Sequence, residues 1–286
     1  MIKKISIMLE MIKFEHTIFA MPFAFMGAFL AERGVPGFAV FGWVVLAMIG
    51  ARTSAMGFNR IVDREFDKIN PRTADRAIPA GAVSLVEAWS MVVLSAALFF
   101  FACYMLNQLT LILSPFALGL TYLYSLTKRF TWLCHLVLGV ALAFSPLGGY
   151  VAVKGAIEGF PFVLCIGVIC WVAGFDTVYA CLDADFDKDA GLFSLPSRFG
   201  RENAFRFAVF LHVVAFVMFI LTGMQMQLNY IYYIGIVLTA GALSYQHLVV
   251  NPKDLSRIQM SFFTMNGLIS LTLFVATWLS LVIANP

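Results

Sequence analysis

A long apolar run of the sequence ends in the polar stretch Asn59-Arg60-Ile61-Val62-Asp63-Arg64-Glu65-Phe66-Asp67. A second apolar run ends in a similar stretch, Asp183-Ala184-Asp185-Phe186-Asp187. In each stretch two aspartates are four residues apart, a spacing that places both on one face of a helix. The corresponding aspartates of the two stretches are 120 residues apart in both cases. This recurrence predicts a binding site built from two parts of the chain.

The composition indicates that lipid is the solvent for most of the chain. Of its 286 residues, 61% are hydrophobic and only 12% are charged, and the mean hydropathy is +0.89. A soluble domain carries about twice that charged fraction. Since a water-exposed fold could not hide so much apolar surface, we expect an all-α integral membrane protein. The small net charge of +3 gives no reason to expect a nucleic-acid partner, and no obligate protein partner can be inferred.

Runs of about 20 mostly apolar residues predict nine membrane-spanning helices around a central cavity. They cover residues 14–31, 38–62, 84–106, 108–127, 131–152, 160–182, 203–223, 228–249 and 261–284. We expect a single domain over residues 1–286, with motifs near 59–81 and 176–200. Spans two to four and six to eight form two pseudo-repeated halves, because each set begins with a helix ending in the Asp-x-x-x-Asp pattern. The residues before the first span predict an amphipathic segment at the membrane surface.

The distribution of positive charge predicts the orientation in the membrane. With the N-terminus in the cytoplasm, 16 of the 19 Lys and Arg residues fall on the cytoplasmic side. Only Arg33 and Lys154 fall on the other side, and Arg52 lies within the second span. We therefore expect a multi-pass protein of a bacterial-type inner membrane, with both aspartate stretches at the cytoplasmic face.

The two stretches together indicate a magnesium–diphosphate site. Four carboxylates and an amide in one pocket repel one another unless they are compensated. Their oxygen-only donors favour Mg²⁺, which commonly binds one or two carboxylates together with substrate phosphates. The alternative, solvated charges at helix ends, is the usual explanation of a lone Asp-x-x-x-Asp pattern, but here the pattern occurs twice. The expected metal ligands are Asn59, Asp63, Asp67, Asp183 and Asp187.

Polar residues continue from both stretches into the hydrocarbon region. Arg52 lies seven residues before Asn59, two turns away on the same helix face. A charged group at that depth requires a partner or a wet cavity. Asp176 and Tyr179 precede Asp183 in a similar way, although Asp176 could also pair with a buried base elsewhere. These residues predict a polar stripe that faces the central cavity.

The motifs resemble those of the UbiA superfamily of membrane aromatic prenyltransferases. The first signature corresponds to Asn59-x-x-x-Asp63-x-x-x-Asp67 followed by Asn70-Pro-Arg-Thr-Ala-Asp-Arg-Ala-Ile-Pro-Ala-Gly81. The second corresponds to Asp176-Thr-Val-Tyr-Ala-Cys-Leu-Asp183-Ala-Asp-Phe-Asp187, which continues to Gly191 and Phe199-Gly200. A short aromatic and basic segment corresponds to Tyr124-Ser-Leu-Thr-Lys128-Arg129. The nine-helix layout also agrees, so the resemblance covers essentially the whole chain.

This resemblance implies a Mg²⁺-dependent transfer of a polyprenyl group from its diphosphate to the ring of an aromatic acid similar to 4-hydroxybenzoate. The product would serve ubiquinone or menaquinone biosynthesis. By the resemblance, Asn59, Asp63 and Asp67 hold one metal ion, and Asp183 and Asp187 hold another. The diphosphate would be bound by the basic residues Arg64, Lys128, Arg129 and Lys188. Candidates for contact with the acceptor or for catalysis are Lys13, His16, Arg52, Tyr124, Asp176 and Tyr179.

The acceptor and the class of protein leave alternatives open. Residues 12–17 lack the Arg-Pro pattern of the best-known 4-hydroxybenzoate branch, which keeps open a bicyclic naphthoate-type acid of the futalosine route to menaquinone. Haem or chlorophyll prenylation has no support in a chain without extra domains. A transporter with inverted repeats is the main alternative from another class, but here the acids gather at one face. A CDP-alcohol phosphotransferase would require an Asp-Gly and Ala-Arg signature that is absent.

The cysteines and the other histidines are expected to be structural. The five cysteines lie in apolar runs without a C-x-x-C pair, which favours buried free thiols. His135, His212 and His247 have no acidic companion at metal-ligand spacing in the sequence.

Overall fold

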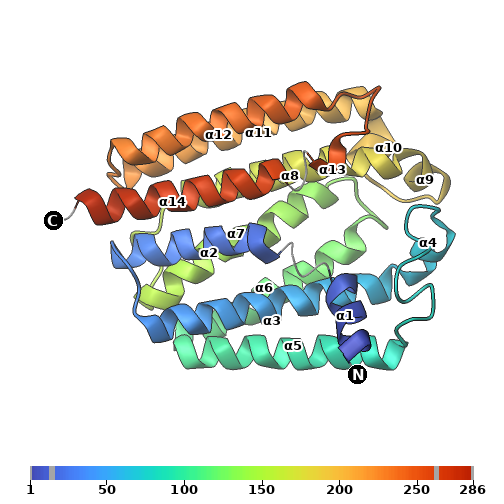
Figure 1. The fold of residues 1–286 in the computed structure, drawn as a ribbon, viewed down its shortest axis with the longest axis horizontal. Helices are drawn as coiled ribbons and strands as arrows, with labels where there is room; N and C mark the ends of the chain where they lie inside the picture. Colours follow the sequence, from blue (N-terminus) through green and yellow to red (C-terminus); the bar gives the residue numbers. More distant parts are fainter. Residues whose placement is uncertain (1, 13–16, 261–263, 285–286) are drawn as a thin grey trace.

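The computed structural model describes residues 2–12, 17–260 and 264–284, and over these residues the chain is a bundle of helices without a β-strand (Figure 1). The long helices are α2 (Thr17–Glu32), α3 (Phe38–Val62), α5 (Leu85–Leu106), α6 (Gln108–Thr127), α7 (Cys134–Lys154), α8 (Phe162–Ala180), α11 (Arg201–Gln225), α12 (Tyr230–Val249) and α14 (Asn266–Ala284). The short ones are α1 (Ile2–Met11), α4 (Arg64–Ile69), the 3₁₀ turn η2 (Cys181–Asp183), α9 (Ala184–Asp189), α10 (Leu195–Phe199) and α13 (Ile258–Met260).

Seven of the long helices, all except α2 and α12, are long and apolar enough to cross a membrane. This finding confirms the all-α fold and fits an integral, multi-pass membrane protein, but it confirms seven of the nine predicted spans rather than all of them. The described part of the first predicted span is a 16-residue helix, α2. The eighth is the 20-residue α12, in which several tyrosines, Gln246 and His247 lower the mean hydropathy.

Single polar residues set the ends of α5 and α6, at the boundaries of two predicted spans. Asn107 alone separates α5 from α6, and its side chain accepts a hydrogen bond from the Thr110 amide (2.9 Å), as an N-cap does. The Asn107 side chain also donates to the carbonyl of Val151 (2.8 Å), which fixes this turn against α7. Ser84 begins α5 with a capping box completed by Glu87. These caps satisfy backbone amides that have no partner within the helix at its first turn.

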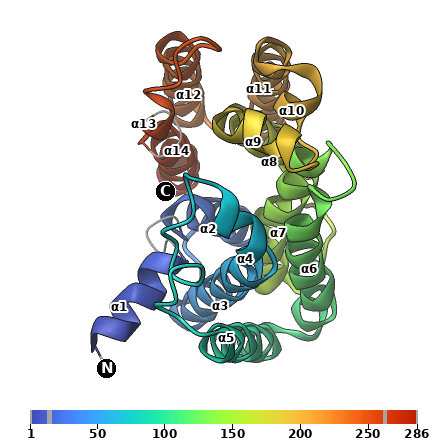
Figure 2. The ribbon, with the colours of Figure 1, turned by 90° about the vertical axis from the view of Figure 1, so that its right-hand side faces the viewer.

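The long helices run side by side, with α5 at the opposite side of the bundle from α11 and α12 (Figure 2). α3 packs on α5, α2 on α7, α7 on α8, α8 on α11, and α14 on both α2 and α12. The α2–α7 contact depends on glycine: a Cβ atom on Gly27 would overlap the carbonyl oxygen of Pro146, and one on Gly149 would overlap that of Ala24. Close approach at small residues is how helices gain contact in lipid, where apolar burial gives little driving force.

The predicted amphipathic N-terminal segment is helical. α1 packs through Met11 and the following Ile12 into a cluster that includes Ile61. The Arg60 side chain donates to the carbonyl of Met11 (3.2 Å), which ties α1 to the end of α3. Its position at the membrane surface remains a prediction.

Candidate active site

One large cavity lies within the bundle, with a volume of about 1250 Å³. Both aspartate stretches line one end of it, at the end of the bundle where α4 and α9 lie (Figure 1). On α3 the lining runs from Val44 to Asp63, which corresponds to about 28 Å of helix. Away from the aspartates the wall is mainly apolar and includes Phe99, Leu106 and Leu142. The cavity therefore has a charged end and a long apolar part.

Each aspartate pair lies across a break between two helices. Asp63 ends α3 and precedes α4 with φ −91° and ψ 1°, and Asp183 precedes α9 with φ −105° and ψ 8°. Asp67 and Asp187 lie within these short helices and are buried. The sequence predicted both aspartates of a pair on one face of a helix, and the Asp67 amide does donate to the Asp63 carbonyl one turn back (2.8 Å), although a break between two helices falls at the first aspartate. A ψ near 0° at the first aspartate turns the chain, consistent with the preference of aspartate for helix ends over helix interiors.

Basic residues neutralise both aspartates of the first stretch. Asp63 lies 3.2 Å from the Arg129 guanidinium, and Asp67 lies 2.6 Å from that of Arg76. Asn59 donates from its side-chain nitrogen to the second oxygen of Asp63 (2.8 Å). Hydrogen bonds of this kind hold the carboxylates in a fixed orientation toward the cavity.

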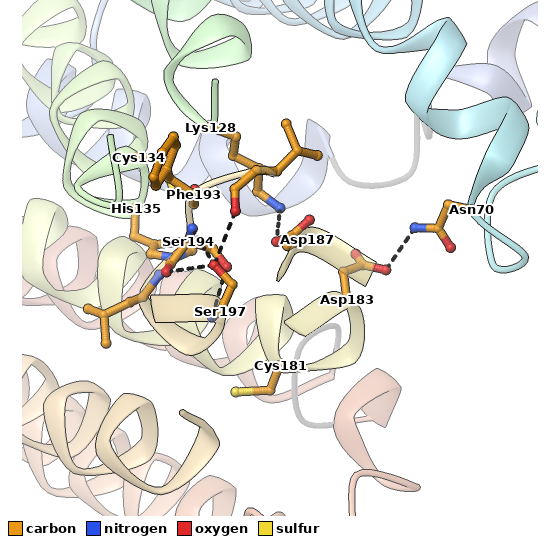
Figure 3. A network of polar contacts seen from close by, with 12 residues as sticks. Asn70, Lys128, Cys134, His135, Cys181, Asp183, Asp187, Phe193, Ser194 and Ser197 are labelled. Carbon is orange, nitrogen blue, oxygen red and sulfur yellow. Dashed lines mark hydrogen bonds and ion pairs between the residues drawn. The ribbon is translucent and has the colours of Figure 1, made fainter. Parts of the chain in front are cut away.

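The second stretch is neutralised in the same manner. Figure 3 shows the contact of Lys128 with Asp187 and that of Asn70 with Asp183. Asp183 forms an ion pair with Arg72, whose Nε donates to Asp183 Oδ1 at 2.8 Å, and Asn70 donates to the same oxygen at 3.1 Å. Asp187 accepts from the Lys128 ammonium at 3.2 Å. The loop between α4 and α5 and the end of α6 therefore bring the two stretches together.

Asn70, Arg72 and Arg76 were missed by sequence reasoning as site residues. They belong to the segment of the first signature that follows Asp67, but none of the three was assigned a role in the site from the sequence. The signal that could have identified them is a pair of arginines four residues apart in a loop that follows a buried acidic stretch. Arg60, which also lines the cavity, was missed because it lies within the first stretch beside Asn59.

The charges of the site shift one another's pKa values. Burial and the neighbouring charge of Asp67 raise the pKa of Asp63, although Arg129 opposes the shift. Burial alone would lower the pKa of Lys128, but the charge of Asp187 and nearby acids raises it overall. Burial alone would also lower the pKa of Arg72, but its hydrogen bond with Asp183 and the charge of Asp183 raise this pKa overall. Lys128 and Arg72 therefore stay charged, and the charge of Asp63 is only partly compensated.

The donor set fits a hard divalent cation. Among the described residues, no group of three or more His, Cys, Asp and Glu side chains is already arranged to hold a metal ion. However, Asp67 Oδ2 is buried and has no hydrogen-bond partner within the described part of the chain. A buried carboxylate oxygen without a partner is costly, and a bound cation would compensate it. The carboxylate and amide oxygens of the two stretches are ligands of the type that Mg²⁺ takes.

The predicted polar stripe is present deeper in the cavity, whose lining includes Arg52, Tyr124, Asp176 and Tyr179. Asp176 Oδ2 lies 2.6 Å from His135 Nδ1, and the Leu195 amide donates to His135 Nε2 at 3.3 Å. Because Nε2 accepts a hydrogen bond, the proton of His135 is on Nδ1 and is donated to Asp176. His135 therefore has an acidic companion in three dimensions, and Asp176 pairs with a buried base on another helix, the alternative that the sequence left open.

Some predicted residues are not at the cavity. Arg64 donates to the Ile61 carbonyl (3.0 Å) and pairs with Glu65 (3.2 Å), and neither Arg64 nor Lys188 is among the residues that line the cavity. Lys13 and His16 lie outside the described residues. His212 and His247 contact each other (2.7 Å between ring nitrogens) between α11 and α12, which agrees with a structural role. All five cysteines are free thiols.

Comparison with known proteins gives consistent matches over most of the chain. A family model described as the UbiA prenyltransferase family matches residues 20–268. A protein of Photobacterium profundum named 4-hydroxybenzoate octaprenyltransferase is 33% identical over 226 residues, 79% of this chain and 78% of that protein. A protein of Escherichia fergusonii with the same name is 30% identical over 251 residues, 88% of this chain and 86% of that protein.

Solved structures agree with these relatives. The apo structure of a UbiA homolog from Aeropyrum pernix has a TM-score of 0.85 at 35% identity, covering 92% of this chain and 96% of that one. The structure of a UbiA homolog from Archaeoglobus fulgidus bound to GPP and Mg²⁺ has a TM-score of 0.67, covering 95% of this chain and 99% of that one. At 18% identity, the second likeness concerns the fold alone.

Proposed function

The chain belongs to the UbiA prenyltransferase family, and from that membership we propose that it transfers a polyprenyl group from polyprenyl diphosphate to the ring of an aromatic acid such as 4-hydroxybenzoate. The observation that carries this proposal is the cavity, in which two aspartate stretches with their bases meet a long apolar space. A prenyl diphosphate has the same division between a charged head and an apolar tail. The names of the relatives support the aromatic acid and a role in ubiquinone biosynthesis.

In this proposal the charged end of the cavity binds the donor head group. Mg²⁺ held by Asn59 and the four aspartates would neutralise the diphosphate and favour cleavage of its bond to the prenyl carbon. Lys128 and Arg129 stabilise the negative charge that develops on the leaving diphosphate. Arg64 and Lys188 attract the donor from outside the cavity lining. The positive charge distribution supports a cytoplasmic position for this end.

The polar stripe binds the acceptor. Arg52 and Asp176 each lie seven residues, or about 10 Å along a helix, before a residue of the charged end. Arg52 binds the acceptor carboxylate, assisted by Lys13 or His16. The ring attacks the prenyl carbon, and Asp176 then takes the proton from the ring carbon that formed the bond. His135 holds Asp176 in place through its Nδ1–H. Tyr124 and Tyr179 line the space between and shield the allylic cation.

The proposal is tested with membranes that contain the chain. They are incubated with Mg²⁺, a radiolabelled polyprenyl diphosphate and a panel of aromatic acids that includes 4-hydroxybenzoate and a bicyclic naphthoate. We expect a prenylated product with 4-hydroxybenzoate that is lost on adding EDTA and in the Asp63→Ala and Asp183→Ala variants. Product with the naphthoate alone would redirect the proposal to the menaquinone route.

A matched control is available within the second stretch. The Asp185 side chain is 87% exposed and pairs with Arg201 outside the cavity lining, so Asp185→Ala should keep most of the activity. If Asp183→Ala keeps as much activity as Asp185→Ala, the proposed site is wrong. If no acid is prenylated with any donor, the transporter alternative gains support.

A further inference from the structure

Four aspartates and four bases are paired one to one at the charged end of the cavity. Each of the four aspartates that line the cavity has one basic partner, and all eight residues belong to the cavity lining. The pairs are Asp63–Arg129, Asp67–Arg76, Asp183–Arg72 and Asp187–Lys128. The formal charges of these eight groups cancel. These eight groups together therefore offer no net negative charge to an incoming cation.

The bases come from two elements that each serve both stretches. The loop between α4 and α5 supplies Arg76 to the first stretch and Arg72 to the second. The end of α6 supplies Arg129 to the first stretch and Lys128 to the second. Neither element carries any of the four aspartates. Both are therefore free to change partners without moving the acidic residues themselves.

The bases in these pairs compete with a metal ion for the carboxylates more strongly than bases in surface ion pairs would. The side chains of Asp67 and Asp187 are only 8% and 3% exposed. A buried carboxylate that loses its partner is left with an uncompensated charge, which is strongly unfavourable. A cation that binds these carboxylates therefore competes with the bases, and a base that is displaced needs another anion nearby.

We propose that the four bases occupy the place of the metal in the donor-free protein and move to the diphosphate when Mg²⁺ and diphosphate enter together. This inference rests on the proposed function, because it assumes that the site binds diphosphate through Mg²⁺. Mg²⁺ alone would face Arg72, Arg76, Lys128 and Arg129 at close range, and repulsion would weaken its binding. With diphosphate present, each base exchanges a carboxylate for a phosphate oxygen. Mg²⁺ and diphosphate therefore bind cooperatively, and each raises the affinity for the other by the same factor.

The cooperativity is measured on the purified protein in detergent, without any turnover. Calorimetric titrations give the affinity for Mg²⁺ alone, for inorganic diphosphate alone and for each in the presence of the other, and the thermal midpoint is recorded in parallel. For the wild type we expect weak binding of Mg²⁺ alone and a clear rise in the midpoint only with both together. In Arg76→Gln, Mg²⁺ alone should bind about tenfold more tightly, because one competing charge has been removed. Binding of diphosphate should weaken in the same variant.

Three further variants make the test specific. Lys128→Gln changes the pair at the other stretch and should also strengthen binding of Mg²⁺ alone, which covers the case that Arg76→Gln does not fold. Arg76→Lys keeps the charge and should restore the wild-type pattern. Arg201→Gln breaks the exposed pair with Asp185 at the same end of the molecule and should change neither affinity.

The outcomes separate this inference from the proposed function. If the wild type binds Mg²⁺ alone as tightly as Arg76→Gln and Lys128→Gln do, the exchange of partners is refuted, while binding of both together leaves the proposed function intact. If Mg²⁺ and diphosphate together bind to none of the proteins, the proposed function fails and the inference fails with it.

Discussion

The first and second aspartate stretches have similar backbone conformations, but their aspartates have different hydrogen-bond partners and different exposure. In both, an aspartate with ψ near 0° precedes a six-residue helix that carries the second, buried aspartate. The side chain of Asp63 is 30% exposed and accepts single hydrogen bonds from Arg129 and Asn59. Asp183 is more buried and accepts from both Arg72 and Asn70, with Arg72 bonded to both of its oxygens.

This difference indicates that the two stretches have different roles in the site. Asp183 is held by the loop between α4 and α5, so the second stretch has a fixed position relative to the first. Asp63 has a pKa raised by burial and by Asp67, so its charge is the less well compensated of the two. We therefore expect the first stretch to be the part of the site that responds more to a cation, and the second to be the part that anchors the loop.

The largest effect should come from the two buried aspartates, where the stretches are most alike. Asp67→Asn and Asp187→Asn each remove a charge from a buried position, and we expect each to lower the rate of prenyl transfer by about a thousandfold or more. The measurement is a single-turnover rate with saturating donor. Asp185→Asn serves as the control, and a loss confined to one of the two buried positions would mean that only one stretch holds metal.

Substitutions of the two bases at the end of α6 should have effects of intermediate size, and the two effects should differ from each other. Lys128 pairs with the buried Asp187, whereas Arg129 pairs with the half-exposed Asp63. Since a pair to a buried partner is less screened by water, we expect Lys128→Met to lower kcat/KM for the donor about a hundredfold and Arg129→Met about tenfold. Equal losses in the two variants would contradict the difference in surroundings described above.

The smallest effect is expected at Arg64, which lies within the first stretch, and at Lys188, which follows the second, because neither lines the cavity. Arg64→Gln and Lys188→Gln should lower kcat/KM by about two- to threefold at low salt, with the loss disappearing at high ionic strength. The assay is initial rate against donor concentration at two salt concentrations. A loss as large as that of Lys128→Met would instead indicate that the side chain contacts the diphosphate directly, as the sequence resemblance predicted.

The helices and the two stretches could be predicted because the signals are local. Apolar runs of membrane-spanning length mark α3 and α8, and the repeated spacing of Asp63–Asp67 and Asp183–Asp187 is visible without a structure. The short helices after each first aspartate were not predicted, since a single residue with ψ near 0° leaves no periodic trace in the sequence.

The partners of the aspartates could not be predicted because they depend on tertiary packing. Arg72 and Asp183 are 111 residues apart, and Lys128 and Asp187 are 59 residues apart. The same is true of His135, which pairs with Asp176 at a separation of 41 residues. Hydropathy and spacing identify charged residues near a membrane boundary, but they do not specify which acid meets which base.

The division of the cavity into a charged end and an apolar length has a consequence for substrates of opposite solubility. If the proposed function is correct, the two substrates do not dissolve in the same medium, since the aromatic acid is soluble in water and the prenyl chain is soluble in lipid. They would meet in one cavity that has a polar end for the first and an apolar part for the second. If the charged end of the cavity faces the cytoplasm, as proposed, the head group of the donor would not have to cross the hydrocarbon, because the charges that replace its water lie at that end. The protein would then act as a phase-transfer catalyst, returning diphosphate to water and leaving the prenylated ring in the lipid.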